Sequence, residues 1–228
     1  MAHLGSAMLP AGTQLLESLL WLPGEGYFLL QRHLERMQRS AQQLGFSFDY
    51  AQLTAQLQRY AAALQVPRKV RLLLDAEGRC VFNDEAVQPS VPVRAALALT
   101  FVRSDELLLQ HKCTARAPYD AALAAVQQLG VQEVLLWNER HELTETASAN
   151  LVLFIDRQAY TPAVSSGLLA GTYRDYLLQA GVLQERVLRV SDLARADSLW
   201  LINSVRRWCS IECINGPAHL PADMQTRS

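Results

Sequence analysis

Short apolar runs separated by turns fill most of the first hundred residues, and two helical segments interrupt them. One pair of runs flanks the Pro/Gly turn at residues 23–26 and another flanks the turn at residues 77–78, so each pair predicts a β-hairpin. Residues 33–44 carry apolar side chains at helical spacing, and residues 49–64 are rich in Ala, Leu and Gln, so both segments predict helices. This grouping of strands and helices indicates an α+β fold.

After residue 105 the pattern changes, and we predict a second domain there. Residues 106–110 form an apolar run that predicts a buried strand, and residues 118–129 predict a helix. Two further strands are predicted at residues 133–137 and 142–146. The predicted domains are a small N-terminal α+β domain at residues 1–105 and a larger C-terminal α/β domain at residues 106–228.

The charge balance and the cysteines argue against several classes of function. The net charge is −1 and the pI is about 6.5, so the composition predicts no binding to nucleic acid or to an anionic membrane. No apolar stretch approaches the ~20 residues of a membrane span, and the opening residues lack the features of a signal peptide. Of the cysteines, only Cys209 and Cys213 are close in sequence, and no histidine pair accompanies them. We therefore expect no metal site, and we interpret the cysteines as reduced thiols of a cytoplasmic protein.

Lysine is rare in this chain, which singles out the lysines that it has. Of 21 basic residues, only Lys69 and Lys112 are lysines. Lys69 leads into a predicted strand, where we expect a solvated charge. Lys112 follows the apolar run at 106–110, where its amine can be desolvated, and desolvation makes an amine available as a nucleophile or proton carrier. The alternative is a lysine at a strand end that extends its charge into water.

Two further segments carry groups that could bind a ligand. Glu145 lies among small residues just before an apolar run, where a carboxylate must be protonated, paired or bound to a cation. A strand-edge glutamate that faces water is the alternative. The glycine-bearing turn at residues 167–171 leads into a predicted helix, whose N-terminal N–H groups can bind a phosphate. Many helices begin in this way without binding anything.

Two more residues complete a set. Ser204 follows a predicted strand, where a hydroxyl can meet an anion or simply cap a turn. Arg36 lies on the first predicted helix, where its guanidinium can reach a phosphate or face water. An amine, a semi-buried carboxylate, a glycine turn, a serine and an arginine are together the groups needed to hold pyridoxal phosphate (PLP).

Four motifs resemble those of a known family. Residues 145–152 match E-x-x-x-x-N-[hydrophobic], and residues 169–175 resemble L-P-G-[IT]-x-R-[DE], with Ala in place of Pro. Residues 196–204 resemble A-D-E-[hydrophobic]₃-T-N-S, and residues 33–37 resemble H-x-x-R-[LM]. With these motifs in this order, the chain resembles the class IV aminotransferase family, the fold-type IV PLP enzymes.

The resemblance implies a fold, a cofactor and a set of site residues. The fold would be the two-domain, α+β fold of the D-amino acid aminotransferase type, with PLP between the domains. Family members are usually homodimers, so a homodimer is expected. The resemblance implies that Lys112 is the Schiff-base lysine, that Glu145 contacts the pyridine nitrogen, and that Arg36, the backbone N–H groups of Thr172 and Tyr173, and Ser204 bind the phosphate.

Within the family, three segments narrow the choice. Residues 111–120, 136–140 and 200–208 resemble the lyase module of bifunctional 4-aminobenzoate synthases. This resemblance implies PLP-dependent conversion of 4-amino-4-deoxychorismate to 4-aminobenzoate and pyruvate, a step of folate biosynthesis, and a functional link to an aminodeoxychorismate synthase. Arg116 and Arg206 are then candidates for binding substrate carboxylates, although either could instead be a structural ion-pair partner.

Two alternatives stay open at this point. The first is a transaminase for branched-chain or D-amino acids, which would use the same lysine. The second is a non-catalytic relic or interaction module of the same fold. The presence of both Lys112 and Glu145 argues against a relic.

Overall fold

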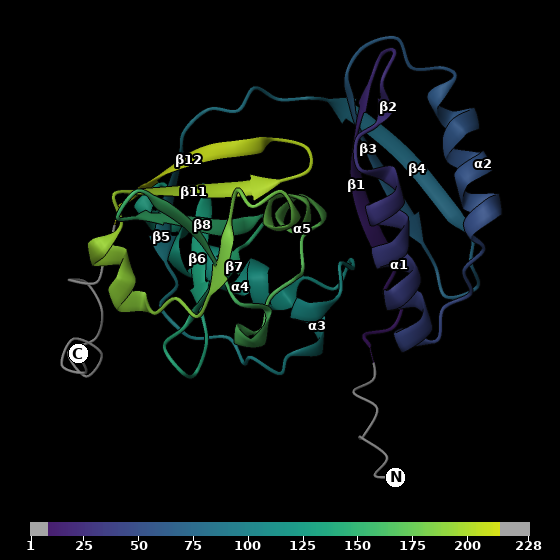
Figure 1. Cartoon of the computed structure of the whole chain (residues 1–228). Coiled ribbons are helices and arrows are strands. Elements are labelled where there is room, and N and C mark those ends of the chain that lie inside the picture. Colours follow the sequence, from purple (N-terminus) through teal and green to yellow (C-terminus); the bar gives the residue numbers. More distant parts are fainter. Residues whose placement is uncertain (1–8, 215–228) are drawn as a thin grey trace. The chain divides into compact units, whose positions relative to one another are not determined.

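The computed structural model describes residues 9–214, which form two compact units (Figure 1). The first unit comprises residues 9–87 and 111–116, and the second comprises residues 88–110 and 117–214. The predicted boundary lay between residues 105 and 106. Contacts within the chain place residues 88–105 in the second unit and return residues 111–116 to the first. Within the described residues, no helix has the length and apolarity needed to span a membrane.

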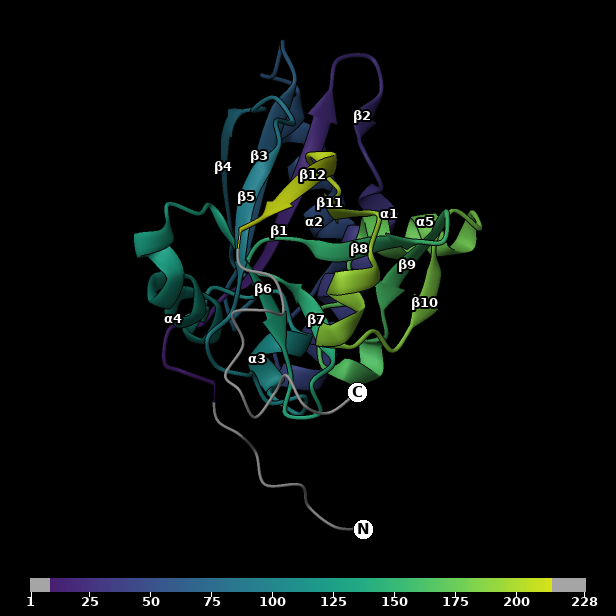
Figure 2. The same ribbon diagram turned by 90° about the vertical axis from the view of Figure 1, so that its left-hand side faces the viewer.

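The first unit is a four-stranded antiparallel sheet with two helices (Figures 1 and 2). The strand order is β2-β1-β3-β4, and both predicted hairpins and both predicted helices are confirmed. The apolar stripe of α1 is buried at Leu34, Met37 and Ala41, which recur at the spacing of one helix face. The elements are β1 (Leu15–Leu22), β2 (Gly26–Tyr27), α1 (Leu30–Leu44), α2 (Tyr50–Ala61), β3 (Arg68–Leu74) and β4 (Cys80–Ala86).

A closed β-barrel forms the centre of the second unit. Its described sheet has the order β10-β9-β8-β11-β12-β5-β6-β7, and β7 also pairs with β8. That last pairing closes six strands into a barrel, while β9 and β10 extend the sheet beyond β8. The strands are β5 (Val93–Leu97), β6 (Glu133–Trp137), β7 (Leu143–Thr146), β8 (Asn150–Ile155), β9 (Gln158–Pro162), β10 (Gln184–Arg186), β11 (Ser198–Asn203) and β12 (Arg207–Cys213).

The barrel interior and the helices against it hold the core of this unit. Buried side chains of β6 and β8 form part of this core, among them Leu135, Leu151 and Leu153. The helices of this unit are α3 (Leu107–Gln110), α4 (Ala117–Val126) and α5 (Thr172–Gln179), with 3₁₀ helices at Gln127–Leu129, Val164–Ser166 and Val190–Arg195.

One predicted strand is wrong. Residues 107–110 form the short helix α3, so the run before Lys112 is not a strand. Among its leucines only Leu109 is buried, and the Leu109 N–H donates to the carbonyl of Glu106 at 3.1 Å. A short apolar run has no period that separates strand from helix, and here no neighbouring strand supplies hydrogen-bond partners.

Candidate active site

The barrel closes at the most specific motif of the sequence. Glu145 on β7 and Asn150 on β8 are the registered pair that joins these two strands. A tight turn connects them, in which the Thr146 N–H donates to the Ala149 carbonyl at 2.8 Å and the Thr146 hydroxyl donates to the same carbonyl at 3.1 Å. The number of residues between Glu and Asn in the motif is therefore set by the length of this hairpin turn.

Two donors hold the Glu145 carboxylate. The Tyr119 hydroxyl on α4 donates to Glu145 Oε1 at 2.8 Å, and the Leu169 N–H donates to the same oxygen at 3.1 Å. Glu145 is 4% exposed, so these bonds form away from bulk water. Hydrogen bonds from such donors stabilise the charged form of a carboxylate. The site therefore contains a buried, oriented acceptor, as a pyridinium nitrogen requires.

The glycine turn is held against the barrel seam. The Asn150 Nδ2 donates to the Leu169 carbonyl at 2.8 Å. A Cβ on Gly171 would lie 1.9 Å from Asn150 Oδ1, so only glycine allows this close approach. Gly171 is the N-cap of α5, with φ −70° and ψ 137°. The motif that carries Glu145 therefore also fixes the start of α5.

Helix α5 presents its N-terminus at this turn. Thr172 and Tyr173 are its first residues and both are buried. Their N–H groups point out of the helix start, where the helix dipole favours an anion. Arg174 anchors the first turn from inside, because its guanidinium donates to the Pro162 carbonyl at 2.8 Å and pairs with Glu185.

Ser204 lies in the turn that follows β11. The Asn203 Oδ1 accepts from the N–H groups of Val205 at 3.0 Å and Arg206 at 2.8 Å, which fixes the turn around Ser204. Ser204 is buried. Ser204 thus directly follows a strand, as predicted, and lies in a turn.

Arg206 forms hydrogen bonds with side chains of the second unit. Its Nη2 donates to the Ser148 hydroxyl at 2.7 Å and to Glu133 Oε1 at 3.3 Å, and the Ser148 hydroxyl also donates to Glu133. This cluster links the turn of Ser204 to the turn beside Glu145. The contacts are those of a structural ion pair, and substrate binding by Arg206 stays a prediction.

Lys112 belongs to the first unit, where β1 holds its backbone. The Leu16 N–H donates to the Lys112 carbonyl at 2.9 Å, and Leu15 bridges to Cys113 in antiparallel register. The Lys112 side chain is half-buried, and its charge contributes to lowering the pKa of His33. The predicted amine thus lies on a fixed backbone beside a central strand of its sheet.

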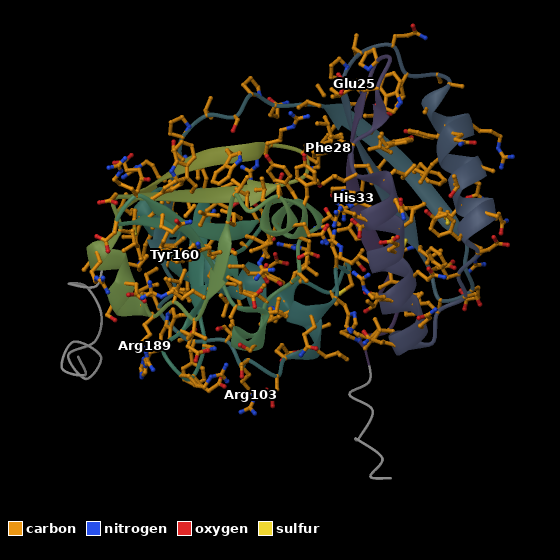
Figure 3. All side chains as sticks on the ribbon, viewed as in Figure 1. Glu25, Phe28, His33, Arg103, Tyr160 and Arg189 are labelled. Atoms are coloured by element: carbon orange, nitrogen blue, oxygen red, sulfur yellow. The ribbon has the colours of Figure 1, made fainter. Side chains whose placement is uncertain are left out.

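Arg36 lies on α1 and pairs with a buried carboxylate of β1. Its Nε donates to Glu17 Oε1 at 2.9 Å and its Nη2 donates to Glu17 Oε2 at 2.7 Å. His33, one turn earlier on α1 and labelled in Figure 3, contacts Glu17 Oε2 through Nδ1 at 2.7 Å. The predicted phosphate-binding guanidinium is thus oriented by a carboxylate.

The same face of α1 also reaches the segment of Lys112. Ser40 recurs at helical spacing after His33 and Arg36, and its hydroxyl lies 2.9 Å from His111 Nδ1. Arg116 closes this segment and lowers the pKa of Cys113 through its charge, although burial raises that pKa overall. A role of Arg116 in substrate binding stays a prediction.

The donor set fits a phosphorylated pyridine. Within the second unit, the N-terminus of α5 and the buried hydroxyl of Ser204 are groups that can bind a phosphate, and the oriented carboxylate of Glu145 can accept from a pyridine nitrogen. Within the first unit, Lys112 carries an amine and Arg36 a guanidinium. The packing of Asn150 on Gly171 holds the glycine turn in the conformation that presents the helix start. Among residues 9–214, no three His, Cys, Asp or Glu side chains gather as metal ligands do.

Sequence reasoning missed two residues that orient this site. Glu17 lies in the apolar strand β1. Tyr119 lies in the segment at residues 111–120, but no role is predicted for it from the sequence. The available signal for Glu17 was a lone carboxylate in a mainly apolar run, because such a carboxylate requires a partner once it is buried. No signal in the sequence pointed from Tyr119 to Glu145, because 26 positions separate them.

Comparison with known families decides the identity of the fold. The family described as Amino-transferase class IV matches residues 14–214. The chain belongs to the class IV aminotransferase family. It therefore has the α+β fold of fold-type IV PLP enzymes, as predicted, and this fold contains a six-stranded barrel. It is a PLP-dependent enzyme of class IV, either a lyase or an aminotransferase.

Relatives of this class IV chain carry both activities in their names. A Schizosaccharomyces pombe protein named "Putative aminodeoxychorismate lyase" is 31% identical over 190 residues, which are 80% of this chain and 82% of the relative. A Mesorhizobium loti structure named "Putative amino-acid aminotransferase" is 31% identical, with a TM-score of 0.82 over 89% of this chain and 100% of that one. The PLP-bound form of a hypothetical aminotransferase from Mycobacterium tuberculosis is 19% identical, with a TM-score of 0.77 over 94% and 88% of the two chains, a likeness of fold.

Proposed function

We propose that this class IV enzyme is an aminodeoxychorismate lyase, which converts 4-amino-4-deoxychorismate to 4-aminobenzoate and pyruvate. One observation carries the proposal: the segment at 111–120, which resembles the lyase module, bears both Lys112 and the Tyr119 hydroxyl that orients Glu145. The Schizosaccharomyces pombe relative supports the same activity. The product would enter folate biosynthesis.

The residues proposed to hold the cofactor are those that the family motifs indicate. Lys112 would bind its aldehyde carbon, and Glu145 would accept a hydrogen bond from its pyridine nitrogen. The phosphate would be bound by the N–H groups of Thr172 and Tyr173 at the start of α5, by the hydroxyl of Ser204 and by the guanidinium of Arg36. When bound, PLP supplies an electron sink for a carbanion next to nitrogen.

Lys112 is proposed to move the proton of the reaction. Its amine, freed once the substrate amine takes its place at the cofactor, would take the hydrogen from the aminated ring carbon, and the ring would become aromatic as the enolpyruvyl group leaves. Lys112 would then return the proton to the methylene carbon of that group, which gives pyruvate. Proton removal and return balance, so this step needs no oxidant and no water. Glu145, held by two donors, would stabilise positive charge on the pyridine nitrogen throughout.

The second candidate is a transaminase for branched-chain or D-amino acids. The Mesorhizobium loti structure favours it, because that likeness covers the whole of the solved chain at the same identity as the lyase relative. A non-catalytic module of the same fold is the third candidate. The presence of both Lys112 and a buried Glu145 that accepts hydrogen bonds from Tyr119 and Leu169 argues against it.

The proposal also covers assembly, partner and location. The family resemblance favours a homodimer, and the likeness to lyase modules favours a functional link to an aminodeoxychorismate synthase. Among the described residues no cysteine forms a disulfide, which favours a cytoplasmic location.

The test offers the PLP-loaded protein both kinds of substrate. With 4-amino-4-deoxychorismate we expect 4-aminobenzoate and pyruvate in equal amounts, measured by fluorescence and by a coupled pyruvate assay. In a parallel sample, branched-chain and D-amino acids should leave the cofactor absorbance unchanged. Conversion of the cofactor by an amino acid, reversed by a keto acid, with no 4-aminobenzoate formed, would instead identify a transaminase.

A further inference from the structure

Glu17 is a buried carboxylate of the first unit. It lies on β1, is 1% exposed, and its neighbours Leu16 and Leu19 are buried. Both of its oxygens accept hydrogen bonds, from Nε and Nη2 of Arg36 at 2.9 and 2.7 Å and from Nδ1 of His33 at 2.7 Å. A carboxylate placed in such a strand requires partners, and α1 supplies all three donors.

The charge state follows from these contacts. Burial by itself raises the pKa of Glu17, but the charge of Arg36 and the contact with His33 lower it to about 2. Burial lowers the pKa of His33. At neutral pH, Glu17 is therefore ionised and His33 is neutral, so the Nδ1 of His33 must carry the hydrogen that it donates.

The geometry fixes the plane of one guanidinium. A bidentate bond through Nε and Nη2 holds both the position and the plane of Arg36. An arginine that has one fixed orientation before a ligand binds loses less side-chain entropy when it binds.

We propose that Glu17 is a positioning residue of the cofactor-phosphate subsite: it holds the Arg36 guanidinium in the orientation that binds phosphate. This inference rests on the proposed function, in which Arg36 binds the phosphate of PLP. Glu17 itself touches neither cofactor nor substrate in this role. The contribution of Glu17 is therefore specific to ligands that carry the phosphate.

The experiment compares PLP with pyridoxal, which lacks the phosphate. The affinity of the full chain for each is measured by titration of the absorbance of the bound chromophore. We expect Glu17→Gln to weaken PLP binding by about tenfold or more and to leave pyridoxal binding unchanged. The matched control is Glu85→Gln, which removes an exposed carboxylate paired with Lys69 at 2.7 Å on the same sheet. That control should change neither affinity.

A second variant covers the case in which Glu17→Gln does not fold. Glu17→Asp keeps the charge, but its side chain is one methylene shorter and cannot hold Nε and Nη2 of Arg36 in the same geometry. We expect the same selective loss of PLP affinity, smaller in size. Circular dichroism of each variant confirms the folded state before titration.

The outcomes separate this inference from the proposed function. An unchanged ratio of PLP to pyridoxal affinity in the folded variants overturns the inference, because Glu17 would then act on the fold alone. A wild-type chain that binds no PLP, or that carries it on a residue other than Lys112, overturns the proposed function and this inference with it.

Discussion

At the scale of single residues, Glu17 and His33 link the stability of the protein to pH. The pKa of Glu17 falls from its ordinary 4.5 to about 2 in the folded chain. The pKa of His33 is lowered from 6.5, chiefly by burial. In both cases the unfolded chain binds the proton more readily than the folded chain does. Stability must therefore rise with pH over the range in which these groups titrate.

We predict that the free energy of unfolding falls in two stages as the pH is lowered. His33 contributes the loss that begins below pH 6.5, and Glu17 contributes the loss between pH 4.5 and about 2. The Glu17 stage is worth on the order of 3 kcal/mol. Urea unfolding from pH 2 to pH 8 measures both. Glu17→Gln should flatten the curve below pH 4.5, and an identical slope in the variant would contradict the assignment.

Residue types alone predicted some site groups and not others. Lys112 and Glu145 were found because each is chemically out of place: one of two lysines, and a carboxylate before an apolar run. The role of Glu17 was missed because its partners lie 16 and 19 positions further on, and a strand sequence does not say which helix will cover it. Likewise, the contacts of Arg206 with Glu133 and Ser148 depend on barrel closure.

At the scale of elements, the start of α5 depends on the hairpin turn that carries Glu145. We predict that Gly171→Ala disrupts it, because the added Cβ would lie 1.9 Å from Asn150 Oδ1. Asn150 is buried and bonded to the Leu169 carbonyl, so moving it breaks that bond. The expected cost is about 1–3 kcal/mol of stability, with weaker PLP binding. Thermal unfolding and PLP titration measure the two effects.

The matched control for this prediction is Gly24→Ala. Gly24 has a φ of +77° and no atom within 4 Å of an added Cβ, so it tests backbone strain without a clash. It should cost about 1 kcal/mol and leave PLP affinity unchanged. If Gly171→Ala binds PLP as the wild type does, the close approach of Asn150 is not needed to shape the turn.

The elements that were predicted well are those with a local signature. Helix α1 has its stripe of Leu34, Met37 and Ala41, and the hairpin of β3 and β4 has its turn. The run at 107–110 was predicted wrongly, because four residues carry no usable period. Its helical state is set by contacts beyond the run.

At the scale of the whole chain, the pairings that build the site are non-local. The barrel is closed by β7 and β8, and β8 also pairs with β11, about fifty residues further along the chain. Residues 111–116 return to pair with β1 after the chain has already entered the second unit. Hydrophobic patterns do not indicate which distant segments pair with one another. The domain boundary predicted after residue 105 therefore did not include the return of residues 111–116 to the first unit. The family motifs supplied what the patterns could not, because they mark Glu145 and the turn at 167–171 directly.

The central claim is that Lys112 holds the cofactor, and one measurement tests it directly. The protein is loaded with PLP, its absorbance is recorded before and after borohydride reduction, and the reduced protein is digested and its peptides mapped. Lys69 provides the matched control, because it is the other lysine of the chain and is exposed in an ion pair with Glu85.

We predict that the band of the bound cofactor disappears on reduction and that the pyridoxyl group is found on Lys112. Lys112→Ala should abolish both signals, and Lys69→Ala should retain both. A pyridoxyl group on Lys69, or an unchanged band in Lys112→Ala, would contradict the account.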